Sequence, residues 1–335
     1  RRVLFRSRAS DSMIEYSLNW NWMRMVNRES VKTLLEMGYE CLKNTDLGSA
    51  EGFFEKALNL DFAHSEVLFS LKCARFWTER LAEIESVADP LLRGDMVVAR
   101  WKTFKVFLTR IPGDSEMAVY AFKRMCFGIG LESYLAADEK EKENLGSEFD
   151  FKVGRCRKFL GDYETALEQL ARTVGTNSDQ AKHLAELADC HWLSGDLRKA
   201  KLLFREAFFL GPEQIDLDYI ESDAIAKLAE KIRIPEEESQ DIRPWISVHG
   251  ELSKVFDVRR ELRSQESSRL NSSILRFENE LKENPARLAW IKPRLLTHYF
   301  WMLHHYDAIQ AEDGRKERIR GKIRLLDEDI FRQYS

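Results

Sequence analysis

The side chains best suited to metal or acid–base chemistry gather near the C-terminus, between His298 and Tyr306. His298 and His305 are seven residues apart and would share one helical face, whereas His304 projects elsewhere. This spacing differs from the i, i+4 histidine pair of a zinc-binding H-E-x-x-H helix. We therefore expect an aromatic packing face or a protein-contact face here, rather than a metal site or the centre of an enzyme.

Other catalytic and cofactor motifs are absent from the sequence. It contains no P-loop, no dinucleotide fingerprint, no G-x-S-x-G elbow and no EF-hand loop. We predict a protein without enzymatic activity and without a cofactor. No two of its five cysteines form a C-x-x-C pair; they are Cys41, Cys73, Cys126, Cys156 and Cys190. Such isolated thiols slightly favour the cytoplasm, and a periplasmic location would require a signal or anchor removed from before Arg1.

The composition predicts long helices around a substantial core. Only 16 Gly and 7 Pro occur in 335 residues, whereas a sandwich or barrel needs a turn about every 8–12 residues. The 20 Phe, 9 Tyr and 8 Trp exclude low-complexity disorder. A formal net charge of −4 argues against nucleic acid as a partner. The longest stretch without a formal charge, 295–306, is well short of the roughly 20 apolar residues that span a membrane.

A repeat of 34 residues organises the middle of the chain. The matching positions are Gly161-Asp162 and Gly195-Asp196, Ala166 and Ala200, and Cys156 and Cys190. Small residues such as Gly38, Gly154 and Ala188 would let a first helix closely approach a second one. A period of this length indicates stacked helical hairpins.

The pattern resembles the tetratricopeptide repeat (TPR), a helix–turn–helix unit with small and large residues in fixed positions. The clear copies are 31–64, 147–180 and 181–214, and 65–146 holds degenerate repeats with an insertion. The resemblance implies an all-α fold, a right-handed α-solenoid over 31–214. We expect 1–30 to be an N-terminal arm whose aromatic segment caps the array or exposes a docking patch. The remainder, 215–335, is a divergent extension of helical hairpins that ends in a capping helix.

Breaks in the sequence predict the helices of the less regular regions. In the degenerate part we expect helices over 65–87, 92–110, 115–130 and 131–145. The glycines at 128 and 130 would separate the last two of these helices. After the last clear repeat, the apolar spacing predicts one helix over 216–232.

TPR arrays bind extended peptides or partner helices on a concave face formed by their first helices. The resemblance implies such a groove here, where basic and aromatic residues suit a partner peptide with acidic and apolar side chains. The alternative is that half of these residues are solvated or packed by the neighbouring hairpin. Phe151 and Arg155 stand where chaperone-binding members would have Lys and Asn, so no chaperone partner is implied. The expected groove residues are Lys32, Tyr39, Lys43, Phe151, Arg155, Lys158, Phe159, Lys182, Asp189 and Trp192.

Two functions fit these observations. The first is a non-catalytic scaffold that binds a partner peptide or helix in the groove and assists assembly of a larger complex, with self-association also open. The alternative is a ligand- or peptide-responsive regulatory protein whose basic helix at 315–324 contacts nucleic acid or an acidic partner. For that helix the simpler interpretation is a solvated face, with Ile319, Ile323, Leu325 and Leu326 turned inward.

Overall fold

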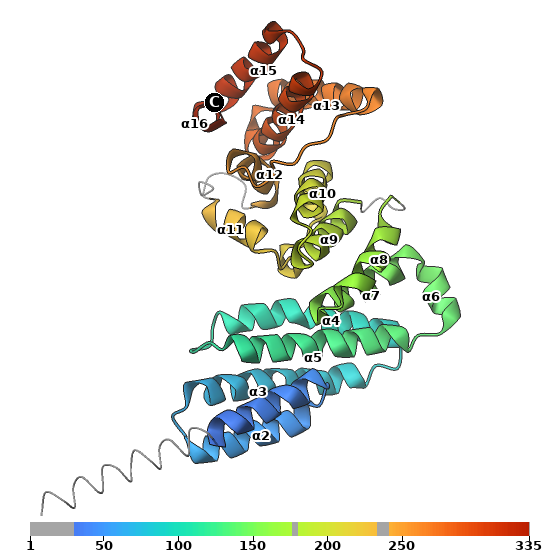
Figure 1. Cartoon of the computed structure of the whole chain (residues 1–335), viewed down its shortest axis with the longest axis vertical. Coiled ribbons are helices and arrows are strands. Elements are labelled where there is room, and N and C mark those ends of the chain that lie inside the picture. The colour runs from blue at the N-terminus through green and yellow to red at the C-terminus, as the bar shows by residue number, and fades with distance from the viewer. Residues whose placement is uncertain (1–29, 176–179, 233–240, 335) are drawn as a thin grey trace, which may run out of the picture. The chain divides into compact units, whose positions relative to one another are not determined.

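The computed structural model describes residues 30–175, 180–232 and 241–334. The arm and aromatic segment predicted before residue 30 lie almost wholly outside this part. Every regular element in the described ranges is a helix, which confirms the all-α fold class (Figure 1). The chain forms two compact units. The first ends at Leu145 and includes Phe159–Gly161, and the second contains Gly146–Lys158 and the chain from Asp162 onwards. In the described ranges, no helix is both long and apolar enough to cross a bilayer.

The first unit consists of helical hairpins whose ends are fixed by side-chain caps. Asp46 accepts a hydrogen bond from the Ser49 amide, and Asp89 caps a helix that has Pro90 in its first turn. Ser115 caps the next long helix by accepting from the Ala118 amide. The helices are 30–43, α2 (Leu47–Leu60), α3 (Ser65–Glu85), α4 (Pro90–Leu108), α5 (Glu116–Leu135) and α6 (Glu139–Leu145).

The break expected between residues 128 and 130 is wrong, because α5 continues through both glycines to Leu135. A glycine inside a helix costs about 1 kcal/mol relative to alanine. Burial of Phe122, Met125 and Phe127 on the same helix offsets that cost. Tyr134, in the part predicted to be separate, packs on Gly94 of α4 and donates a 2.9 Å hydrogen bond to Asp95. Packing against α4 therefore keeps α5 continuous.

The second unit begins with two helical hairpins that follow the sequence repeat. Their helices are α7 (Ser147–Leu160), α8 (Tyr163–Thr173), α9 (Gln180–Leu193) and α10 (Leu197–Leu210). Gly161 and Gly195 occupy the two turns with φ angles of 83° and 91°, a left-handed conformation that glycine adopts without strain. A β-carbon on Gly154 would lie 2.9 Å from Leu170 of α8, so the small residue allows close helix packing as expected.

The chain after α10 differs from the helix predicted over 216–232. Short 3₁₀ turns, η1 (Pro212–Gln214) and η2 (Leu217–Tyr219), precede a helix, α11, that covers only Asp223–Lys231. The amides of Glu221 and Ser222 donate to the carboxylate of Asp189 on α9 rather than to helical carbonyls. A tertiary contact therefore replaces the helix that the apolar spacing suggested.

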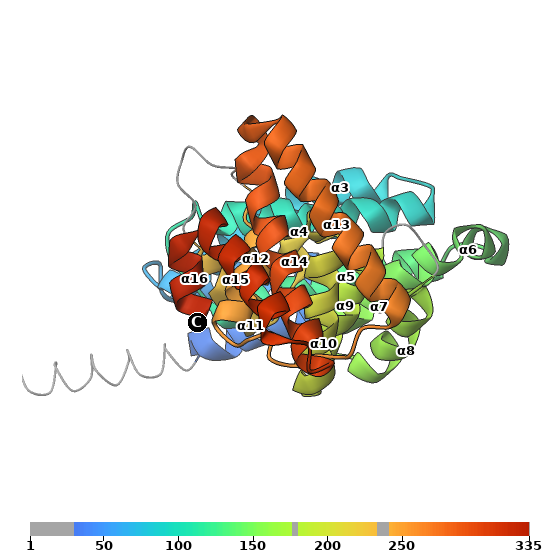
Figure 2. The same ribbon diagram turned by 90° about the horizontal axis from the view of Figure 1, so that it is seen from above.

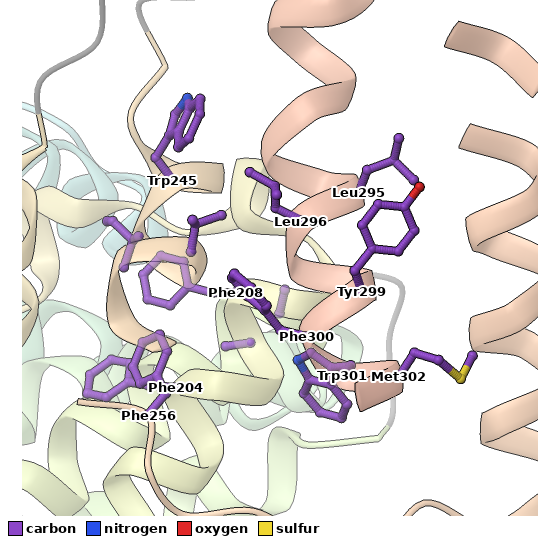
Figure 3. Packing of buried hydrophobic residues seen from close by; sticks show 14 of the residues in the cluster. Phe204, Phe208, Trp245, Phe256, Leu295, Leu296, Tyr299, Phe300, Trp301 and Met302 are labelled. Carbon is purple, nitrogen blue, oxygen red and sulfur yellow. The ribbon is translucent and has the colours of Figure 1, made fainter. Parts of the chain in front are cut away.

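The remaining elements surround α14. They are α12 (Arg243–Leu252), α13 (Ser264–Glu283), η3 (Pro285–Arg287), α14 (Leu288–Ala308), α15 (Asp313–Leu326) and α16 (Glu328–Tyr334). Helix α14 lies between α13 and α15 (Figure 2). Leu296 and Phe300 lie on one side of α14, and Tyr299 and Met302 lie on another (Figure 3). A helix that is buried on several sides has an apolar surface most of the way round.

One hydrophobic core runs from α9 to the C-terminal helices of the second unit. Phe204 and Phe208 of α10 belong to the same buried cluster as Trp245 of α12 and Phe300 of α14 (Figure 3). The boundary drawn at residue 214 from the sequence therefore crosses a continuous core. The reason is that the face of α10 carrying these two aromatic side chains packs against helices from the C-terminal third.

Candidate binding sites

The groove residues expected in the first repeat are divided between surface and interior. Lys32 and Lys43 lie at the surface, where they pair with Glu36 and Glu40 at 3.9 and 2.6 Å. Tyr39 is buried, and its hydroxyl lies 2.8 Å from Glu66 and 3.0 Å from Ser70 of α3. Burial raises the pKa of the Tyr39 hydroxyl. The expectation that Tyr39 faces an open groove is therefore corrected: it joins helix 30–43 to α3.

Aromatic groove residues of α7 are also in the interior. Phe151 is 1% exposed, and the Lys182 ammonium lies 4.2 Å from its ring centroid. Phe159 is 3% exposed and stacks on Phe127 inside the first unit. Neither ring is available as an anchor for a partner, because each is already covered by the chain itself.

Three charged groove residues of α7 and α9, Arg155, Lys158 and Asp189, form a buried ion-pair network with Glu186. Lys158 Nζ lies 2.6 Å from Asp189 Oδ2 and 3.3 Å from Glu186 Oε1. Arg155 Nε donates to the same Glu186 oxygen at 2.6 Å. Burial alone would lower the pKa of Lys158, but the neighbouring carboxylates of Asp189 and Glu186 raise it, so the ammonium stays charged. These residues bind each other rather than a free peptide.

The segment Ile215–Asp223 lies against this network. Lys158 donates to the Tyr219 carbonyl at 2.8 Å, and the Arg155 guanidinium lies 4.2 Å from the centroid of the Tyr219 ring. The Trp192 indole donates a 2.9 Å hydrogen bond to Asp223. Apart from Ser222, the side chains of this segment are acidic and apolar, which is the chemistry predicted for a partner peptide. On this face, the segment Ile215–Asp223 of the same chain contacts the residues that were predicted to bind a partner peptide.

A separate cavity of about 500 Å³ opens in the second unit, between α10, α13 and α14. Its volume is within the roughly 300–1,000 Å³ typical of ligand sites. The lining includes four arginines and three glutamates, which are Arg260, Arg269, Arg276, Arg294, Glu206, Glu213 and Glu266. None of these was among the expected groove residues.

Among the described residues, only two of the four arginines that line the cavity form ion pairs with carboxylates. Arg260 binds Glu206 and Glu266, and Arg294 binds Glu213. Arg269 and Arg276, both exposed on α13, have no carboxylate partner in the part of the chain that the structure describes. The α13 wall is therefore positively charged.

Aromatic side chains of α10, α13 and α14 also line the cavity. Phe209 stacks on Trp301 with ring centroids 4.3 Å apart, and His298 lies 4.8 Å from Phe209 and 5.2 Å from Phe277. His298 Nδ1 is 2.7 Å from the Arg294 carbonyl, which can only accept, so the neutral ring carries its proton there. Burial lowers the pKa of His298 to about 4. At neutral pH its Nε2 is therefore a bare acceptor.

His304, which the sequence places on a different face from His298, lies in a buried network. Arg205 donates to Glu251 at 2.6 Å and to His304 Nδ1 at 2.7 Å, while His304 Nε2 is 3.1 Å from the Tyr334 hydroxyl. This network connects α10, α12, α14 and α16 and agrees with the packing face expected for residues 298–306. Among the described residues, no group of histidine, cysteine and carboxylate side chains is placed to hold a metal ion.

The basic helix, α15, already has several carboxylate partners. Lys316 pairs with Asp307 at 3.0 Å, Lys322 with Glu278 at 2.6 Å and Arg320 with Glu317 at 2.6 Å. Ile319 and Ile323 turn inward as expected, but Leu325 is 91% exposed, so its predicted burial is wrong. It lies one residue before the helix terminus at Leu326, on the side away from the core.

A scan of protein-family models finds no match to this chain, and a search of curated proteins finds none either. What the chain binds must therefore be inferred from its own side chains.

Proposed function

We propose that this protein is a non-catalytic helical-repeat scaffold of the TPR type that binds another protein, and that the partner docks in the arginine-lined cavity of the second unit. The observation that carries the proposal is that Arg269 and Arg276, which lack carboxylate partners among the described residues, line the same cavity as the partly buried Phe209. Arginine and aromatic side chains are enriched in protein interfaces, and Arg, Trp and Tyr are enriched among the few residues that dominate the binding energy.

The α7–α9 face is a weaker choice for a docking site. A partner peptide would have to displace Ile215–Asp223, which is covalently attached and therefore present at a high effective concentration. It would also expose the buried Lys158–Asp189 pair. The cavity needs no such displacement.

Nucleic-acid binding through α15 is also less favoured. Three of its basic side chains, Lys316, Arg320 and Lys322, lie within 3.0 Å of carboxylates. Phosphate contacts would compete with these pairs, and the net charge of the chain is −4.

The docking site can be tested by photo-crosslinking in cells. A photo-reactive amino acid would replace Ser273, which lines the cavity, or its neighbour Ser272, which is exposed outside the lining. Position 273 should crosslink one defined protein, position 272 should not, and Arg276→Glu should abolish the product. The captured protein should then bind the purified full chain.

Two results would show that the partner does not enter this cavity. One is that positions 272 and 273 give identical crosslinked products, and the other is that the product at position 273 survives Arg276→Glu.

A further inference from the structure

The two arginines of α13 define the partner more closely, and this inference rests on the proposed function. We infer that the cavity binds an extended acidic segment of the partner, in which two carboxylate side chains three residues apart contact Arg269 and Arg276. Five observations on the second unit support this: spacing, volume, charge, aromatic lining and hydrogen-bonding capacity.

The spacing of the arginines sets the spacing of the acids. Arg269 and Arg276 are seven residues apart on α13, so they share one face and lie about 10.5 Å apart along the helix axis. In a polyproline-type segment, which rises about 3.1 Å per residue with three residues per turn, positions i and i+3 share a face about 9.3 Å apart. In a β-strand these positions would face opposite sides.

The size of the cavity favours a segment narrower than a helix. A helix with its side chains is about 10–12 Å wide, whereas the cavity of about 500 Å³ is in the lower half of the range for small-ligand sites. An extended segment is narrower and can lie along α13 without moving α14.

The charges select an acidic segment over a basic one. The three glutamates of the lining are each held by Arg260 or Arg294, and those pairs would have to break to receive a basic segment. Arg269 and Arg276 are available to form bidentate pairs with incoming carboxylates.

Apolar and polar surfaces beside the arginines can contact the rest of the segment. Leu270 and Phe277 each follow one of the arginines, are buried and line the cavity. Trp301 also lines it, and its buried indole N–H has no acceptor among the described residues. Leu270, Phe277 and Trp301 are almost completely covered, but the exposed Leu210 and the partly buried Phe209 also line the cavity. These two side chains offer apolar surface to the rest of the segment, which favours an aromatic or aliphatic residue next to the acids.

Two fluorescein-labelled peptides of equal composition and charge test the spacing against the full chain by fluorescence anisotropy. One is Gly-Asp-Pro-Pro-Asp-Phe-Gly, with acids three apart, and the other is Gly-Pro-Asp-Asp-Pro-Phe-Gly, with adjacent acids. We expect the first to bind at least about tenfold more tightly. Arg269→Glu and Arg276→Glu should each abolish the preference, whereas Lys282→Glu, an exposed charge change on the same helix, should preserve it.

Equal affinity for the two peptides would overturn the inference, as would a preference that survives Arg276→Glu. Circular dichroism melting of each variant establishes that the fold is kept. The two experiments distinguish failure of this inference from failure of the proposed function. If position 273 crosslinks a defined partner but the two peptides bind equally, the docking site is retained and the spacing of the acids is rejected. Absence of any specific crosslink rejects the docking site itself.

Discussion

Lys158 and Asp189 form a salt bridge of 2.6 Å in which both side chains are fully buried. The pair joins α7 to α9, and its remaining hydrogen bonds hold the backbone of Tyr219, Glu221 and Ser222. Charges that the sequence suggested for partner binding thus hold the second unit together.

Removing one charge of this pair should be severely destabilising. In Lys158→Met, Asp189 keeps a buried charge without its ammonium partner, which costs about 3–5 kcal/mol. Urea unfolding followed by circular dichroism measures the loss. Lys43→Met removes a surface pair with Glu40 and should cost less than about 1 kcal/mol. Similar losses in the two variants would contradict a central role for the buried pair.

Asp189→Ala should release the segment after α10. The amides of Glu221 and Ser222 would lose their acceptor, so both should exchange hydrogen with solvent faster. Hydrogen–deuterium exchange with mass spectrometry monitors the peptide that contains them. Asp223→Ala, which removes the exposed contacts of that carboxylate with Trp192 and Lys227, serves as the control. Unchanged protection in Asp189→Ala would mean that other contacts hold this segment.

Two glycines of the first hairpin should respond to alanine in opposite directions. A β-carbon at Gly38 would lie 2.3 Å from the Phe54 ring, so Gly38→Ala should destabilise the protein by about 1–3 kcal/mol. A β-carbon at Gly52 in α2 meets nothing within 4 Å, and Gly52→Ala should stabilise by up to about 1 kcal/mol. Thermal melting compares the two variants. Equal shifts would mean that Phe54 moves away from position 38 without cost.

Acid should destabilise the second unit partly through His298. Its pKa falls from an ordinary 6.5 to about 4 in the folded protein because burial disfavours the charged ring. Between these values the unfolded chain binds a proton that the folded chain does not, so the free energy of unfolding falls as the pH drops from 6.5 to 4. The contribution is at most roughly 3 kcal/mol. Urea titrations of wild type and His298→Asn across this range should show a shallower decline in the variant, and parallel curves would refute the assignment.

Local sequence features located much of the secondary structure. Asp89-Pro90 marks the start of α4, and Gly161 and Gly195 mark the turns of two hairpins, because capping and positive φ angles depend on residues close in sequence. Position 128 misled the prediction, since a glycine breaks a helix only where packing does not compensate. Nothing local distinguished 216–222 from a helix either, because its competing contact with Asp189 comes from another element.

The sequence by itself determined that this protein is all-α, with two adjacent helical hairpins offset by 34 residues and a chain rich in aromatic core residues. The tertiary structure decided which charges are buried and which face solvent. Lys158 and Arg269 are both basic residues on helices, yet one is enclosed against Asp189 and the other lies on the wall of a cavity. Helical periodicity places a side chain on a face, but only the packing of distant elements determines what covers that face.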